Sequence, residues 1–123
     1  MSEFTKLMLI AFAGAGGTLA RHGVNVLFRT LKWSDTFPWH TFIINLTGSF
    51  LLGTLAVALK DRPHLLIILG VGFCGGFTTF SSFSLEIAKM IGEQRFAAAG
   101  LYALGSLALG ILGAVLGMRM LEK

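Results

Sequence analysis

Long apolar segments separated by short polar ones dominate the pattern along this chain. Four segments are nearly free of charged residues and cover most of the sequence: Leu7–Phe28 (interrupted by Arg21), Thr36–Leu59, Pro63–Leu85 and Phe96–Met118. Because a helix rises about 1.5 Å per residue, each segment reaches about 30 Å or more, which matches the hydrocarbon core of a bilayer. The pattern predicts an all-α membrane protein: one domain over residues 1–123, with four transmembrane helices at about 5–29, 37–59, 64–90 and 96–119.

The connections between these segments are short, at Thr30–Asp35, Lys60–Arg62 and Ile91–Arg95. They require antiparallel neighbours, so we expect an up-down bundle with both termini on one side of the membrane. The side of the termini then carries Lys6, Lys60, Arg62, Arg119 and Lys123, and the other side carries Arg29, Lys32, Lys89 and Arg95. Five basic residues against four give no orientation bias. This balance is either a weak signal in a short protein or the mark of a chain that inserts both ways round.

Composition supports the membrane assignment. Only 13% of the residues are charged, about half the share typical of a soluble domain. The net charge of +4 does not indicate a nucleic-acid partner, because the basic residues gather at segment ends, where they meet lipid headgroups. The first segment also loosely resembles a signal peptide, with small residues at Ala13–Ala15, but its apolar character continues to Phe28. Cys74 is the only cysteine, so an intramolecular disulfide is excluded.

The middle of the third segment is poorly suited to a uniform helix. Gly72, Gly75 and Gly76 are followed by Thr78 and Thr79, so flexible backbone precedes β-branched hydroxyl residues. Backbone that leaves a helix at membrane depth is tolerated only inside protein or along a water-filled path. We therefore predict a break at Gly75–Thr78, with a functional site beside it.

Neutral polar residues line one face of the second segment. Thr41, Asn45 and Ser49 are spaced by four residues, which places them on the same side of a helix. The two hydroxyls are expected to bond other helices or their own backbone. Asn45 has two donor hydrogens and an acceptor to satisfy, so it fits an internal path as well as a helix–helix contact.

Further neutral donors follow the break and recur in the fourth segment. Ser81 and Ser82 follow the predicted break, and Tyr102 and Ser106 share a stripe with Gly110. A tyrosine reaching the interface and a serine filling a gap would be the structural alternative. All of these groups can donate a hydrogen bond to an anion, and neutral donors let an anion pass without trapping it.

Two charged residues interrupt the apolar segments. Arg21 lies about fifteen residues into the first segment and is either functional or a counter-charge near a helix end. Glu86 is either part of a site or a solvated residue at the membrane rim. His22, His40 and His64 show no metal-ligand spacing.

The run Gly-Phe-Cys-Gly-Gly-Phe-Thr-Thr-Phe-Ser-Ser-Phe-Ser at residues 72–84 closely resembles the Fluc (CrcB) family of bacterial fluoride channels. Supporting similarities are Gly-Gly-Thr-Leu-Ala-Arg at 16–21, Asn-Leu-Thr-Gly-Ser-Phe at 45–50, and Tyr102 with Ser106. The resemblance covers essentially the whole chain. It departs at Gly110, where relatives can carry a hydroxyl, and at His22, where a tyrosine is common.

This resemblance implies a fluoride channel in the bacterial inner membrane that passively exports fluoride from the cytoplasm. It also implies a dual-topology homodimer of antiparallel subunits that encloses two pores and contacts membrane lipid. The implied fluoride pathway comprises Asn45, Phe80, Phe83, Thr41, Ser81, Ser82, Tyr102, Ser106, Arg21 and Glu86.

Two features of the implied site depend on the break. A structural sodium ion would sit at the dimer centre, held by backbone carbonyls of Gly75 and Thr78 from both subunits. Alternatively, Ser and Thr side chains satisfy these carbonyls. Phe80 and Phe83 share a helix face and would present their positive ring edges to the anion, whereas Phe77 would fall within the break.

Other functions fit the sequence less well. Small four-helix drug/proton antiporters share the length and span count, but they need a carboxylate in the first span, where only Glu3 occurs, outside the apolar segment. An intramembrane hydrolase would need a nucleophile with a base. The chain has no Gly-x-Ser-x-Gly and no mid-span histidine, so we do not expect an enzyme.

Overall fold

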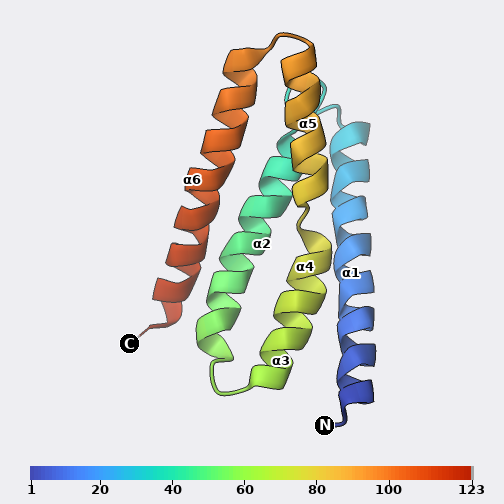
Figure 1. Cartoon of the computed structure of the whole chain (residues 1–123), viewed down its shortest axis with the longest axis vertical. Coiled ribbons are helices and arrows are strands. Elements are labelled where there is room, and N and C mark those ends of the chain that lie inside the picture. The colour runs from blue at the N-terminus through green and yellow to red at the C-terminus, as the bar shows by residue number, and fades with distance from the viewer. Residues whose placement is uncertain (123) are drawn as a thin grey trace.

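Four antiparallel helical spans make up the computed structural model, which describes residues 1–122 (Figure 1). The elements are α1 (Glu3–Thr30), α2 (Trp39–Ala58), α3 (Pro63–Ile67), the π-helical segment η1 (Ile68–Cys74), α4 (Gly75–Phe77), α5 (Phe80–Gly92) and α6 (Phe96–Leu121). The run from α3 to α5 forms the third span, and all four spans are long and apolar enough to cross a membrane. The all-α prediction with four spans is confirmed, and the start of α1 and the end of α6 lie at the same end of the bundle.

Local sequence explains where the helices begin and end. Ser2 caps α1 by accepting a hydrogen bond from the Thr5 amide, and Pro63 occupies the first turn of α3, where its missing N–H costs nothing. The turns after α1 and α5 each place one residue in the left-handed region, Lys32 at φ 58° and Gln94 at φ 60°. These tight turns permit the short connections.

The third span is bent, as predicted, but its break lies slightly later than expected. Gly75 is still helical, and so is Phe77, so the prediction that Phe77 falls within the break was wrong. The chain leaves the helix at Thr78 (φ −83°, ψ 160°) and Thr79 (φ −146°, ψ 120°). The three glycines expected to break the helix instead have helical geometry, and two β-branched residues take the extended conformation that suits them.

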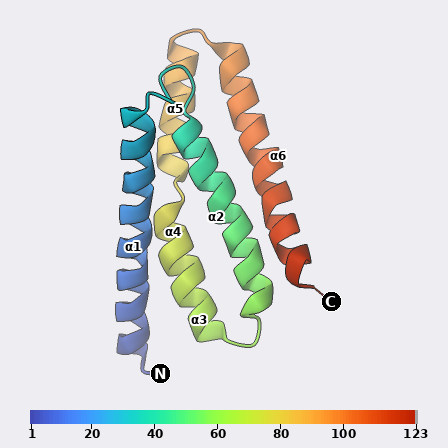
Figure 2. The ribbon, with the colours of Figure 1, turned by 180° about the vertical axis from the view of Figure 1, so that it is seen from behind.

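Glycines bring the spans close together. A Cβ on Gly17 of α1 would collide with the backbone of Phe73, and one on Gly76 would collide with Gly14 of α1. On the other side, a Cβ on Gly53 of α2 would meet the backbone of α6. The third span therefore packs against α1, and α2 packs against α6, as the view from behind also shows (Figure 2).

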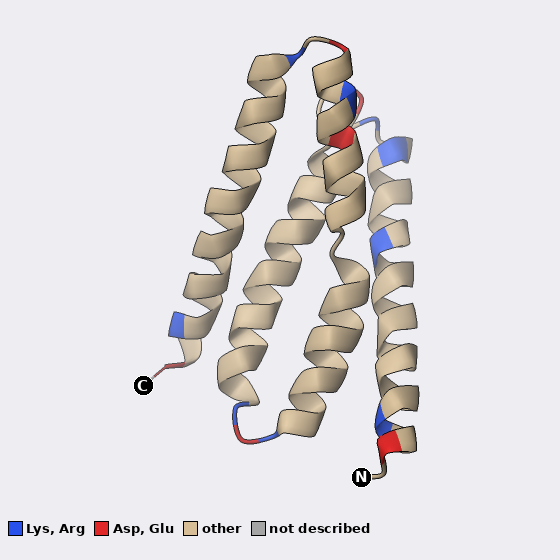
Figure 3. Cartoon of the chain, in the orientation of Figure 1, with Lys and Arg blue, Asp and Glu red and all other residues tan. Residues whose placement is uncertain are grey.

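Most of the apolar surface faces outward. Leu104 is 70% exposed and Phe12 is 73% exposed, whereas the largest fully buried side chains are Tyr102, Ile44 and Thr41. Charged residues concentrate at the ends of the spans (Figure 3). A single chain of this shape is therefore suited to lipid, or to a partner, around most of its circumference.

Candidate functional site

Asn45 joins α2 to the break in the third span. Its Nδ2 donates to the Thr79 carbonyl at 3.1 Å, and the Thr79 amide donates to Asn45 Oδ1 at 2.9 Å. The carboxamide thus replaces both backbone partners that Thr79 loses by leaving the helix. The second Nδ2 hydrogen is not required for this pairing.

Other side chains satisfy neighbouring groups at the break. The Thr78 amide and hydroxyl both donate to the Cys74 carbonyl, each at 2.9 Å. Arg21 Nε donates to the Gly76 carbonyl at 3.1 Å. Thr79 caps α5, since its hydroxyl accepts from the Ser82 amide at 3.2 Å. The break is therefore stabilised by specific hydrogen bonds from α1 and α2.

Two carbonyl oxygens at the break differ from these. Within residues 1–122, no hydrogen bond ends on the carbonyl oxygen of Gly75 or of Thr78. These are the two oxygens for which the sequence resemblance implies a cation. Within the same residues, no group of three or more His, Cys, Asp or Glu could hold a metal ion.

An open cleft of about 550 Å³ lies beside the break. Its walls come from α2, the third span and α6. The lining residues are Asn45, Gly48, Ser49, Leu52, Gly70, Cys74, Gly75, Thr78, Thr79, Phe80, Phe83, Ala103, Ser106 and Leu107. None of them carries a charge. One, Ser106, has a buried hydroxyl oxygen without a hydrogen-bond partner in the described chain.

Aromatic rings lead from the cleft toward the end of the bundle that carries the α1–α2 and α5–α6 connections. Phe80 and Phe83 have ring centroids 6.2 Å apart, and Phe83 meets Tyr102 edge-to-face at 4.9 Å. Phe80 is 80% exposed. Its ring is therefore available to a partner or an ion and is not packed in the core of this chain.

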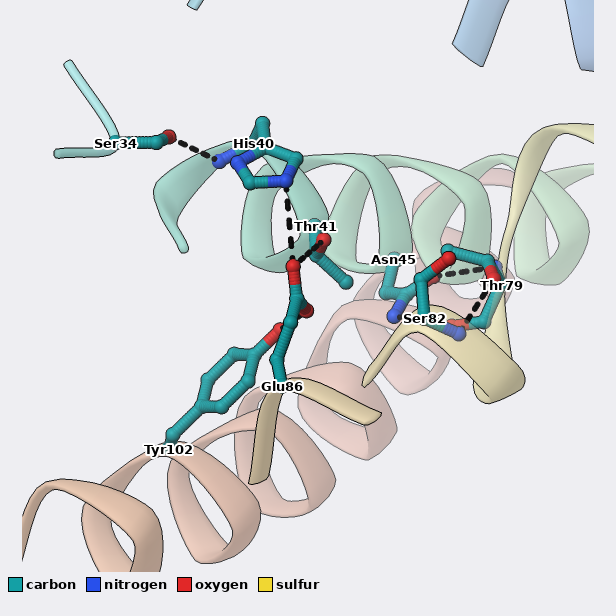
Figure 4. A network of polar contacts seen from close by, with 8 residues as sticks. All are labelled: Ser34, His40, Thr41, Asn45, Thr79, Ser82, Glu86 and Tyr102. Atoms are coloured by element: carbon teal, nitrogen blue, oxygen red, sulfur yellow. Dashed lines mark hydrogen bonds and ion pairs between the residues drawn. The ribbon is translucent and has the colours of Figure 1, made fainter. Parts of the chain in front are cut away.

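Polar side chains gather around the Glu86 carboxylate, next to Tyr102, whose ring contacts Phe83 (Figure 4). Glu86 Oε1 accepts from the Tyr102 hydroxyl at 2.7 Å, and Oε2 accepts from the Thr41 hydroxyl at 2.9 Å. His40 Nε2 lies 3.3 Å from the same Oε2. We call these four residues, His40, Thr41, Glu86 and Tyr102, the Glu86 cluster.

The structure thus divides the predicted pathway residues into groups. Asn45, Phe80, Phe83 and Ser106 share the cleft with Gly75 and Thr78. Thr41, Glu86 and Tyr102 share the Glu86 cluster. Ser81 is exposed and Ser82 half-buried at the start of α5, and Arg21 lies on α1 at the opposite side of the break.

Sequence reasoning missed two participants. Thr79 is the residue that Asn45 pairs with and the cap of α5; a hydroxyl three residues before Ser82 at a helix start was an available signal. His40 was considered only as a metal ligand. His40 precedes Thr41 in the sequence. This position could have indicated a contact with Glu86 only if the packing of α2 on α5 were known.

Comparisons with known proteins all find the same family. The family model described as CrcB-like protein, Camphor Resistance (CrcB), matches residues 8–118. A fluoride-specific ion channel FluC of Caulobacter sp. (strain K31) is 44% identical over 124 residues, covering 97% of this chain and 96% of its own. A FluC of Phenylobacterium zucineum (strain HLK1) is 38% identical, covering 95% of each chain. FluC 1 of Listeria monocytogenes serotype 4b (strain F2365) is 38% identical, covering 94% of this chain and 96% of its own.

Proposed function

Because this chain belongs to the CrcB family, we propose that it is a fluoride-selective ion channel of the bacterial inner membrane. It exports fluoride passively from the cytoplasm, where fluoride accumulates after entering as the neutral acid. The relatives named as fluoride-specific channels match nearly the full length of the chain, which supports the same activity here.

The observation that carries this proposal is the uncharged cleft beside the break. Ser106 places a partnerless hydroxyl there, and Asn45 retains one amide hydrogen beyond its pairing with Thr79. The first turn of α5 also lines the cleft, so the positive end of a helix adds a favourable field for an anion. Such groups replace part of a small anion's hydration shell without the deep trap that a fixed positive charge would create.

The aromatic rings and the Glu86 cluster continue this pathway. Phe80 and Phe83 offer ring edges, which carry partial positive charge, and Phe83 contacts Tyr102 of the cluster. Thr41 and Tyr102 would pass the anion toward the end of the bundle that carries the α1–α2 and α5–α6 connections, which we call the loop end. Ser81 and Ser82 add donors at the start of α5, and Arg21 acts by holding the Gly76 carbonyl.

The pathway is completed in this proposal by a second, antiparallel copy of the chain. The cleft is open and Phe80 is 80% exposed, so one subunit does not surround an ion at this point. The five-to-four count of basic residues is consistent with insertion in both orientations. Two subunits related in this way would form two equivalent pores.

A structural sodium ion at the dimer centre fits the residues present. The carbonyls of Gly75 and Thr78 lack hydrogen-bond partners within residues 1–122, and main-chain oxygens are suitable ligands for a hard cation. The ion would neutralise these dipoles and join the subunits. A high-resolution map with oxygen contacts clearly below about 2.8 Å supports a cation, whereas water-like distances of about 2.8 Å or more contradict it.

The structure and the comparisons do not favour a drug/proton antiporter. The only acidic residue of α1 is Glu3, which lies in the first turn and pairs with Lys6 at 3.0 Å. No carboxylate of α1 is therefore placed inside the bundle for proton exchange. We accordingly propose a channel and not an exchanger or an enzyme.

Fluoride efflux from proteoliposomes tests the proposal. Vesicles loaded with potassium fluoride should release fluoride only after valinomycin lets potassium follow, because passive anion flow is electrogenic. Release without valinomycin, driven by a proton gradient, would contradict a channel. Vesicles loaded with potassium chloride provide the selectivity control and should release far less anion.

A further inference from the structure

His40 lies where bulk protons can reach the pathway. It is the second residue of α2, and its backbone amide donates to the Ser34 hydroxyl at 3.1 Å, which fixes the start of the helix. Its Nε2 lies 3.3 Å from Glu86 Oε2, and the two side chains are 25% and 20% exposed (Figure 4). The pair is thus partly exposed to solvent, at the loop end of the bundle.

The Glu86 carboxylate opposes an anion in two ways. Its negative charge repels fluoride. It also accepts the hydrogen bonds of the Thr41 and Tyr102 hydroxyls, which lie on the predicted pathway, so these hydroxyls are not free to donate to an anion. A proton on the adjacent imidazole would cancel the net charge of the pair. Imidazole is the side chain whose charge changes near neutral pH.

Other charges at this end do not substitute for His40. They are Arg29, Lys32, Asp35, Lys89, Glu93 and Arg95. Arg95 pairs with Glu93 at 3.8 Å and donates to the Thr36 carbonyl, and within residues 1–122 the only ion pair of Glu86 is with His40. From α5 and α6, the titratable groups of the cluster that surround His40 are Glu86 and Tyr102.

We propose that His40 sets the charge of the Glu86 cluster, and that its protonation raises fluoride conduction through the loop-end mouth of the pathway. This inference rests on the proposed channel function. It makes the channel more conductive in acid, where more fluoride enters a cell as the neutral acid.

The test is the fluoride current across planar bilayers that contain the purified protein, with both sides changed together from about pH 8 to about pH 5.5. Current is the right readout because neutral hydrogen fluoride crosses a bilayer without carrying charge. By Coulomb's law, a unit charge about 8 Å from any anion, at an effective dielectric of about 20, changes the local concentration of that anion by up to about thirtyfold, and salt reduces this. We therefore expect a roughly three- to tenfold rise in wild-type current on acidification.

Variants at position 40 separate charge from structure. His40→Gln should give a flat profile at the level that the wild type shows at high pH. His40→Arg should give a flat profile at or above the low-pH level, since its charge is permanent. His64→Gln is the matched control: His64 is exposed on α3 at the other end of the bundle, and its loss should leave the wild-type profile unchanged.

The outcomes are distinct. A flat wild-type profile, or a fall in current on acidification, overturns the inference even if neither variant at position 40 folds. A pH response that survives in His40→Gln assigns it to another group and also overturns it. Fluoride current absent at every pH would instead contradict the proposed channel function.

Discussion

Replacing Asn45 by leucine should destabilise the fold, because Thr79 at the break loses its two hydrogen-bond partners. The substitution keeps the approximate volume but removes both bonds to Thr79, at 3.1 and 2.9 Å, and strands one backbone N–H and one carbonyl. At the bilayer average of about 0.6 kcal/mol per bond the loss is about 1 kcal/mol. At about 1–3 kcal/mol for each stranded group it is about 2–6 kcal/mol. We expect about 3 kcal/mol, because Thr79 has already left the helix and has no backbone alternative.

Unfolding by sodium dodecyl sulfate in mixed micelles, followed by the fluorescence of Trp33 and Trp39, measures this change. Asn25→Leu is the matched control, since the buried Oδ1 of Asn25 has no partner in the described chain and its loss should cost less than about 0.5 kcal/mol. If Asn45→Leu is as stable as the wild type, or if both variants lose the same free energy of unfolding, the Asn45–Thr79 bonds do not stabilise the break.

Three further predictions concern the pathway, the packing and the orientation. Phe80→Ile and Phe83→Ile keep apolar bulk but remove the ring edge, so fluoride efflux should fall by about tenfold. The size-exclusion profiles should stay those of the wild type. Unchanged efflux in both variants would mean that the two rings serve only packing. Gly17→Ala should cost more than about 2 kcal/mol of unfolding free energy because its Cβ meets the Phe73 backbone. Gly23→Ala, which meets nothing within 4 Å, should gain up to about 1 kcal/mol, and equal effects of the two would contradict the packing. Tags at the C-terminus should be accessible from both sides of the membrane in cells; access from one side only would contradict dual topology.

The spans were predictable because bilayer thickness imposes a length on apolar segments, and short connections impose antiparallel neighbours. The bend in the third span was predictable from composition, but its position was not. Glycine permits many backbone conformations without choosing one, and Gly75 stayed helical, next to Gly76, where the third span closely approaches α1. The break moved to Thr78 and Thr79, where Asn45 of a distant span supplies the missing partners.

The Glu86 cluster was only partly predictable. Spacing placed Thr41 and Asn45 on one helix face, and it did so correctly, but it could not say which of them meets Glu86. That depends on how α2, α5 and α6 pack, which periodicity does not encode. His40 entered the cluster by the same packing, and a single histidine with no ligand spacing gave no signal of it.

The reversal potential of the current across a bilayer with mainly fluoride on one side and mainly chloride on the other, and a known small amount of fluoride on the chloride side, tests fluoride selectivity most directly. An uncharged cleft with neutral donors, in a chain of the CrcB family, should pass fluoride and exclude chloride. The reversal potential should therefore lie close to the fluoride equilibrium potential. A value near zero, which means that both anions pass equally well, would contradict it.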